Sequence, residues 1–154
     1  MAMSDTSSAP RIEITPYWAA VQRDLLALVD LTPDERMDWS PKPELWNFRS
    51  ILLHIASARD YWMGKIVGDG DPAASVYATT RSRDDMKVQF TRTWGRLGRF
   101  LADPVALERE YQEDAVVSGH WIAFHVLEHD NHHRADLLHY LALLGIATPE
   151  GGTP

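Results

Sequence analysis

Residues 125–134 read HVLEHDNHHR, and this stretch determines what fold and chemistry the rest of the chain must supply. His125, His129 and His133 recur every four residues, a spacing that places them on one face of an α-helix. Two imidazoles four residues apart have Cβ atoms about 5–6 Å apart, so both can bind one metal ion. The stretch therefore predicts a long helix with a histidine face suited to a metal.

A further histidine, His54, stands alone in the apolar run ILLHIA at residues 51–56. Burial of a polar ring costs free energy unless the ring finds a partner, and a metal is one such partner. If this run forms a second helix packed against the first, His54 completes a three-histidine site. A histidine-rich helix also occurs without a metal, as a solvated face, a pH-sensitive contact, or a set of core histidines that donate to backbone carbonyls. For any single histidine the structural role is the more common one.

Helical periodicity of the apolar residues predicts four long helices and no β-strand. The first begins at the N-cap candidate Thr15 with a proline behind it, and the third begins at Ser82 with Asp85 as a capping box. Gly145 fits the position just after the last helix. Short helical turns are expected at residues 32–35 and between the last two long helices. The long helices are predicted at residues 15–31, 48–67, 82–101 and 119–144. These elements predict an all-α fold, a four-helix bundle with sites built from side chains of facing helices.

The composition is that of one packed domain. The chain has 154 residues, of which 45% are hydrophobic, which is enough for a sizeable core. We expect the domain at residues 12–146, after a flexible segment at residues 1–11 and before a tail at residues 147–154. No apolar run approaches the length of a membrane span and the N-terminus does not resemble a secretory signal, so a cytoplasmic protein is expected.

Charge and cysteine content narrow the chemistry. The formal net charge is −7, and no run of Lys or Arg forms a basic patch, so nucleic acid is disfavoured as a partner. The chain contains no cysteine, which excludes disulfides, thiolate ligands and a cysteine nucleophile. Any thiol chemistry therefore needs a thiol from outside the protein.

Two motifs resemble the DinB/YfiT-like superfamily of metalloenzymes. One is LHIASARDYW at residues 53–62, a helical histidine followed by an aromatic pair, and the other is EHDNHHR at residues 128–134. The segment WNFRS at residues 46–50 is similar to the family's approach to its second helix. With the order of helices, the resemblance covers roughly residues 12–146.

The resemblance implies a four-helix bundle with an up-down-down-up course, often a homodimer. It implies a divalent metal, zinc or nickel, held by His54 from the second helix and by His129 and His133 from the last. Some subgroups of the family use a low-molecular-weight thiol as cosubstrate for a small-molecule substrate. Many relatives continue the second motif with Gly and then Gln or Glu, whereas this chain has Ala135 and Asp136. Asp136 is placed to hold the ring of His132 or His133.

The other histidines are expected to have lesser roles. His125 shares the face of His129 and either lines the pocket or replaces a ligand in another register. His132 is expected to be structural or to support a ligand, and His120 and His139 to lie at a cap or on the surface.

Four further side chains near the motifs are expected to have ordinary structural roles. Trp46 and Trp62 are expected to pack in the core, with a place in a substrate pocket as the alternative. Arg134 is expected to pair with an acidic residue of a neighbouring helix. Glu128 is expected to face solvent or another helix, and the motif lacks the general base of the His-Glu-x-x-His metalloproteases.

Three neutral imidazoles with an open position are typical of a catalytic metal site. The first functional hypothesis is therefore a metal-dependent enzyme. The resemblance implies an S-transferase or isomerase that uses an external thiol. A hydrolase that uses a metal-bound hydroxide is equally compatible with the three histidines. The second is a non-catalytic, metal-binding or stress-response dimeric bundle, which the missing general base favours.

Overall fold

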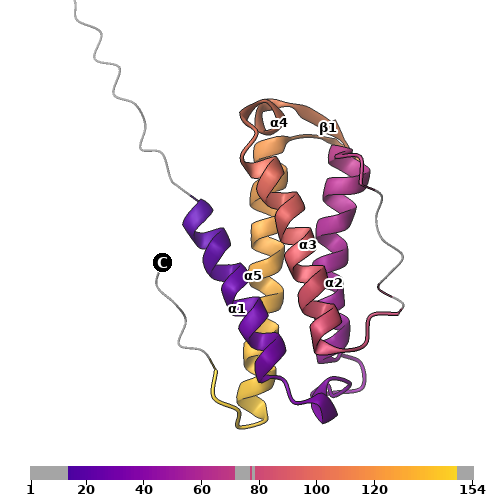
Figure 1. The fold of residues 1–154 in the computed structure, drawn as a ribbon, viewed down its shortest axis with the longest axis vertical. Coiled ribbons are helices and arrows are strands. Elements are labelled where there is room, and N and C mark those ends of the chain that lie inside the picture. Colours follow the sequence, from indigo (N-terminus) through magenta and orange to yellow (C-terminus); the bar gives the residue numbers. More distant parts are fainter. Residues whose placement is uncertain (1–13, 72–76, 78, 149–154) are drawn as a thin grey trace, which may run out of the picture.

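The structure is a computed structural model that describes residues 14–71, 77 and 79–148. The described part is an elongated bundle of helices with a short cap at one end (Figure 1). The expected segment at residues 1–11 and most of the expected tail lie outside the described residues. The elements in chain order are α1 Thr15–Leu31, η1 Asp34–Arg36, α2 Phe48–Asp60, η2 Tyr61–Val67, α3 Arg83–Leu101, α4 Pro104–Glu108, β1 Glu110–Gln112, β2 Val116–Ser118 and α5 Gly119–Leu143.

The long helices pack side by side with α1 and α5 running one way and α2 and α3 the other, as the colour gradient in Figure 1 shows. Side-chain contacts agree, because the starts of α2 and α3 both lie near the end of α1. Arg83 Nε donates to Asp34 just beyond α1 at 2.7 Å, and Arg49 at the start of α2 donates to the carbonyl of Arg81.

The helix boundaries largely follow the predicted signals. Ser82 and Asp85 form the expected capping box of α3, and Gly145 has the positive φ of 70° expected after the last helix. The predicted cap of α1 is wrong: the helix already includes Thr15, and the preceding Ile14 makes no side-chain cap. Pro16 favours this start, because its fixed φ suits a first helical turn.

The predicted second helix changes character halfway. Residues 48–60 are α-helical, whereas residues 61–67 of η2 form a π-helix, which ends at Gly68 with a φ of 73°. A π-helix pairs each N–H with the carbonyl five residues back and shifts the side chains around the axis. Trp62 is thereby buried, while Tyr61 lies near the surface and donates to Glu113 at 3.0 Å.

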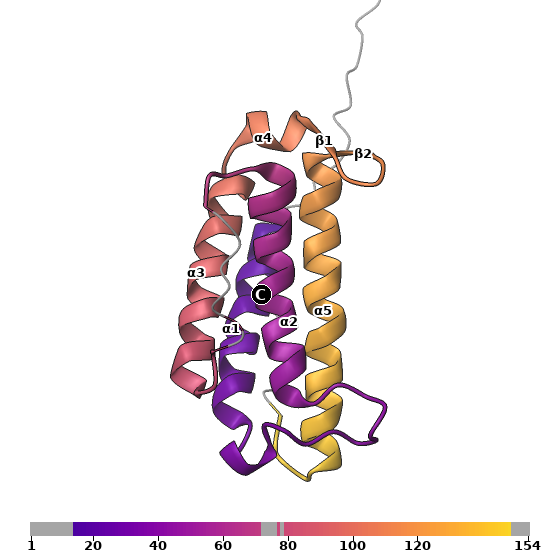
Figure 2. The same cartoon turned by 90° about the vertical axis from the view of Figure 1, so that its right-hand side faces the viewer.

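The expectation of an exclusively helical chain is wrong, because residues 110–118 form a β-hairpin. β1 and β2 are antiparallel and pair Tyr111 with Val117. Each strand has three residues, too few for alternation to be visible in the sequence. Figure 2 shows the hairpin and α4 closing the end of the bundle where α5 begins.

The core is apolar and lies between all four long helices. Its largest fully buried apolar side chains include Trp18, Phe48, Phe90 and Met63. The apolar side chains of α1 that recur with helical spacing are buried: Trp18, Val21, Leu25, Leu28 and Val29. None of the helices in the described part of the chain combines the length and apolar character needed to cross a lipid bilayer.

An ion network ties the connection after η2 to the bundle. The carboxylate of Asp60, on α2, accepts from Arg96 of α3 at 2.6 Å and from Arg92 at 2.9 Å. Arg96 Nε also donates to Asp69 at 2.8 Å, beyond the π-helix. Burial alone raises the pKa of Asp60, but the hydrogen bonds of Arg92 and Tyr77 outweigh it and hold that pKa below its usual value. The network stabilises the parallel pair α2–α3.

Gly119, the first residue of α5, fits against α4 with no room for a side chain. A Cβ added there would lie 2.2 Å from the carbonyl oxygen of Ala106 and 2.7 Å from Cα of Leu107. We expect Gly119→Ala to lower the free energy of unfolding by about 2 kcal/mol, because backbone atoms must move to relieve the overlap. Chemical denaturation measures the change.

Gly98→Ala is the matched control, because an added Cβ at this position of α3 meets nothing within 4 Å. It should leave stability unchanged or raise it by up to about 1 kcal/mol, since alanine favours helix. Equal stabilities of the two variants would contradict the close contact.

Candidate metal centre

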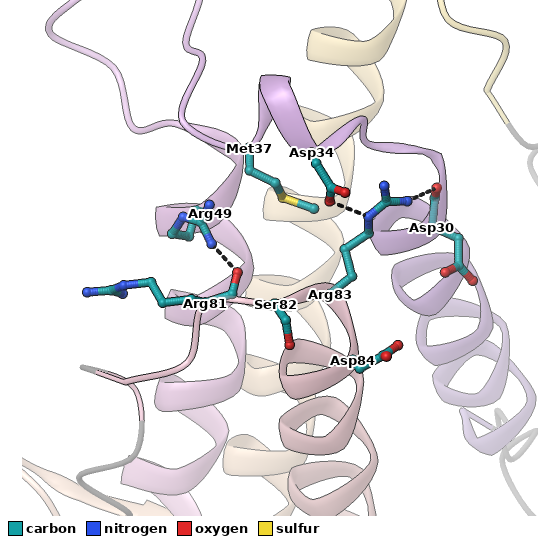
Figure 3. A pocket seen from close by; sticks show the side chains of 8 residues that line it. All are labelled: Asp30, Asp34, Met37, Arg49, Arg81, Ser82, Arg83 and Asp84. Carbon is teal, nitrogen blue, oxygen red and sulfur yellow. Dashed lines mark hydrogen bonds and ion pairs between the residues drawn. The ribbon is translucent and has the colours of Figure 1, made fainter.

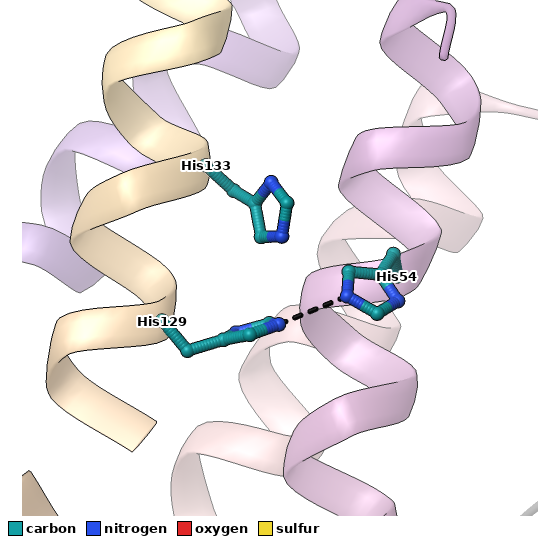
Figure 4. A group of neighbouring side chains, drawn as sticks. All are labelled: His54, His129 and His133. Carbon is teal, nitrogen blue, oxygen red and sulfur yellow. Dashed lines mark hydrogen bonds between the residues drawn. The ribbon is translucent and has the colours of Figure 1, made fainter. Parts of the chain in front are cut away.

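Three histidines converge where α2 packs against α5. His54 comes from the apolar run in α2, and His129 and His133 come from successive turns of α5 (Figure 4). One ring nitrogen of each lies within 4.8 Å of the others, and Nε2 of His54 is 2.9 Å from Nε2 of His129. The structure thus brings together the three residues that the sequence selected.

The three rings are held at similar separations. Ring centroids are 4.9 Å apart for His54 and His129, 4.9 Å for His54 and His133, and 4.7 Å for His129 and His133. The side chains of His129 and His133 are 18% and 15% exposed, so the centre lies just below the surface.

The environment of His54 and His133 favours the neutral form of both rings. Burial, followed by the proximity of His129 and His133, lowers the pKa of His54 to about 4. Burial, followed by the proximity of His129, also lowers the pKa of His133, although Asp136 opposes the shift. Only a neutral imidazole has the lone pair that binds a metal, so the lowered pKa values favour ligation at neutral pH.

Carboxylates fix the orientation of both rings on α5. Nδ1 of His129 lies 3.4 Å from Oδ1 of Asp130, and Nδ1 of His133 lies 3.3 Å from Oδ2 of Asp136. A carboxylate accepts a hydrogen bond, so each Nδ1 carries the proton and each Nε2 keeps a lone pair. This is the arrangement of metal-binding histidines, whose second nitrogen donates to a carboxylate.

These donors fit a divalent metal. Two nitrogens bound to one tetrahedral zinc are about 3.3 Å apart, a few tenths of an ångström from the spacing seen between His54 and His129. Imidazole nitrogens suit zinc, nickel, copper and iron alike. The same close pair also forms a hydrogen bond between the two rings, which is the competing use of these nitrogens.

Asp130 anchors the centre through a buried ion pair that the sequence did not reveal. Its Oδ2 accepts from Nε of Arg59 at 2.8 Å and lies 2.7 Å from Nη2 of the same arginine. Both side chains are fully buried, and Arg59 also donates to Gln22 of α1 at 2.9 Å. Asp130 thus takes the position next to His129 where a metalloprotease motif has its general base, and it links His129 to α2. Its only sequence signal is an acidic residue beside a ligand histidine.

Aromatic rings flank the centre along the contact of α2 and α5. Trp46 was expected to pack in the core, but it is 51% exposed. The centroid of its ring lies 4.7 Å from that of His54, and its ring stacks on that of His133 at 6.1 Å. On the other side, one turn before His129, His125 stacks on Trp121 at 4.7 Å. Trp62 meets the edge of this pair, with its ring 5.0 Å from His125. His125 therefore lines the surroundings of the centre and is not brought into the triad.

The remaining predicted residues lie outside the triad. His132 is 65% exposed and faces Asp136, while His120 and His139 are on the surface, as expected. Arg134 donates to Asp24 of α1 at 2.7 Å, which confirms the predicted interhelix pair.

A separate hollow of about 610 Å³ lies at the junction of η1 and the starts of α2 and α3 (Figure 3). Its arginines already have partners: Arg83 binds Asp34 and the carbonyl of Asp30, and Arg49 binds Asp38 and the carbonyl of Arg81. These contacts of Arg83 and Arg49 join the loops and helix ends around the hollow.

Comparison with known proteins agrees with the motifs. A sequence model of the DinB superfamily matches residues 17–137. The chain belongs to the DinB superfamily. In structure it is similar to a DinB-like protein from Bacillus cereus, with a TM-score of 0.75, 14% sequence identity, and coverage of 92% of this chain and 95% of that one. At this identity the likeness shows the DinB-like fold alone. No curated protein matches the sequence.

We expect His54→Ala and His129→Ala to abolish metal occupancy, because each removes one of three converging nitrogens. Metal analysis of the purified variants, with about one ion per chain expected in the parent protein, measures the change. His139→Ala is the control, because this exposed histidine of α5 lies outside the triad. Full occupancy in either triad variant would refute the assignment.

The metal-free protein should lose stability as pH falls from about 6.5 towards 4. The folded state holds the pKa of His54 at about 4, below the value of about 6.5 in the unfolded chain. The unfolded chain therefore takes up the proton first, and the contribution of the neutral ring, complete above 6.5, is lost as pH falls through the folded value. Melting temperature measured against pH should fall less steeply for His54→Gln, and identical slopes would contradict the lowered pKa.

Proposed function

We propose that this DinB-superfamily protein is a metal-dependent enzyme that acts on a small molecule, with an external low-molecular-weight thiol as nucleophile in an S-transferase or isomerase reaction. The observation that carries the proposal is the convergence of three imidazoles, with the pKa of His54 and of His133 lowered, beside aromatic rings. A divalent ion, zinc or nickel, held by His54, His129 and His133 supplies a Lewis acid that makes a thiol or water more acidic and polarises a substrate oxygen.

The chain's own residues prepare the site for this chemistry. Asp130 and Asp136 hold the two α5 rings with their Nε2 lone pairs directed inward, so no rotation is needed when a ligand arrives. The ring of Trp46 lies against the rings of His54 and His133 and covers part of that side. His125, stacked on Trp121, adds a group able to give or take a proton one helical turn from His129.

The external thiol is supported by the composition. The chain has no cysteine, so a thiol nucleophile must come from solution. Such a molecule would reach the ion where the rings of His129 and His133 are partly exposed.

A second candidate function is a non-catalytic bundle in which the histidines serve structure. The 2.9 Å contact between Nε2 of His54 and Nε2 of His129 favours it, because a hydrogen bond between these rings satisfies both without a metal. The two functions differ in whether the centre takes an exogenous ligand.

Cobalt-loaded protein titrated with a low-molecular-weight thiol tests the proposal. Direct ligation is expected to produce a sulfur-to-cobalt charge-transfer band, because the fourth position of a catalytic site stays open. The band should be absent in His129→Ala and present in His139→Ala. Cobalt bound with no response to thiols would contradict the thiol-dependent enzyme, and failure to bind cobalt would support the structural bundle.

The stability gained from the metal should shrink as pH falls through about 6. Protons and metal compete for the same nitrogens, so the loaded protein keeps its advantage only where the rings are neutral. Melting temperatures of loaded and chelator-stripped protein should converge between pH 7 and 5. Parallel curves would mean that the histidines do not hold the ion.

A further inference from the structure

A second group of potential ligands lies on the outer side of the triad. His132, His133 and Asp136 each offer one ligand atom, and these atoms lie within 4.8 Å of one another. Oδ2 of Asp136 is 3.3 Å from Nδ1 of His133 and 3.7 Å from Nε2 of His132. His133 therefore belongs both to the triad and to this outer group.

The two nitrogens of His133 face the two groups. Nδ1 faces Asp136, while Figure 4 shows Nε2 directed towards His129 and His54. One ring thus stands between an outer carboxylate and the inner nitrogens. No other residue in the described part of the chain is shared by two such groups.

Exposure falls steeply from the outer group to the triad. The side chains of His132 and Asp136 are 65% and 40% exposed, against 15% for His133. Solvent therefore reaches the outer pair freely, whereas the inner nitrogens are largely covered. An ion approaching from solution meets His132 and Asp136 before it meets His133.

A hollow of about 450 Å³ is lined by the outer residues His132 and Asp136. Its lining includes Glu44, His132 and Asp136 together with the rings of Trp46 and Tyr140. Trp46 is the wall between this hollow and the triad, because its ring contacts both His54 and His133. The loop that carries Trp46 is anchored by Tyr140, whose hydroxyl donates to the carbonyl of Trp46 at 3.0 Å.

We propose that His132 and Asp136 form a capture site that binds a divalent cation first and passes it on to Nε2 of the adjacent His133 in the triad. Nε2 of His132 and Oδ2 of Asp136 are close enough for both to reach one ion at ordinary ligand distances of about 2.0–2.2 Å. Glu44 adds negative charge to the same hollow. Protein ligands there replace part of the hydration shell in steps, which lowers the barrier to entering a covered site that needs an access path.

The capture site rests on the metal centre proposed above. It affects the rate of metal uptake, whereas the centre determines whether metal binds at all, so the two proposals can be tested separately. Stopped-flow uptake of Zn²⁺ by metal-free protein should be about tenfold slower in His132→Ala, near the lower end of the effect of removing a group around a metal site. Release should slow by the same factor, so the dissociation constant stays unchanged. His139→Ala is the matched control, an exposed histidine two turns further along α5, and should match the parent protein.

Uptake by His132→Ala at the parental rate would overturn the capture site, and so would a weaker dissociation constant with an unchanged uptake rate. If the parent protein takes up no Zn²⁺, the metal centre itself is wrong.

A second measurement detects the outer site directly. The double variant His54→Ala/His129→Ala keeps only the outer group, and calorimetry with Ni²⁺ should show weak binding that disappears when His132→Ala is added. Binding that survives the third substitution would also overturn the proposal.

Discussion

Arg59 and Asp130 form an ion pair with both side chains fully buried between α2 and α5. A charge in this position is tolerated only with its partner, and loss of one partner in such a pair typically costs about 3–5 kcal/mol. The pair therefore fixes how far α2 is displaced along α5. His129 directly precedes Asp130, and His54 lies on the same helix as Arg59, so the same registration sets the 2.9 Å approach of the two imidazoles.

The neighbouring Asp60 forms ion pairs that hold α2 against α3, as Arg59 holds α2 against α5. Consecutive residues on a helix point in different directions, so Arg59 reaches Asp130 while Asp60 reaches Arg96 and Arg92. Two adjacent side chains thus hold α2 against two neighbours by charge, in addition to the apolar core. The polar contacts specify one arrangement of the helices, where apolar packing alone tolerates sliding.

Features with a signal in the sequence could be predicted, whereas contacts and elements without such a signal could not. The spacing of His129 and His133 and the apolar setting of His54 indicated the triad, and Ser82 with Asp85 indicated the start of α3. The partnership of Arg59 with Asp130 joins residues 71 positions apart, so no local pattern reveals it. The hairpin at residues 110–118 was missed because three-residue strands carry no periodicity. Trp46 was misjudged because large aromatic residues are usually buried, whereas here the ring covers histidines at the surface.

The parallel course of α2 and α3 places a long connection between the two halves of the triad. His54 lies before this connection, and both α5 histidines lie after it. A chain cut within it would consist of two polypeptides, one with α1 and α2 and one with α3 to α5, and neither would contain a complete ligand set. A bound ion would then join separate molecules, so the bundle is a natural scaffold for a split protein whose reassembly reports the presence of metal.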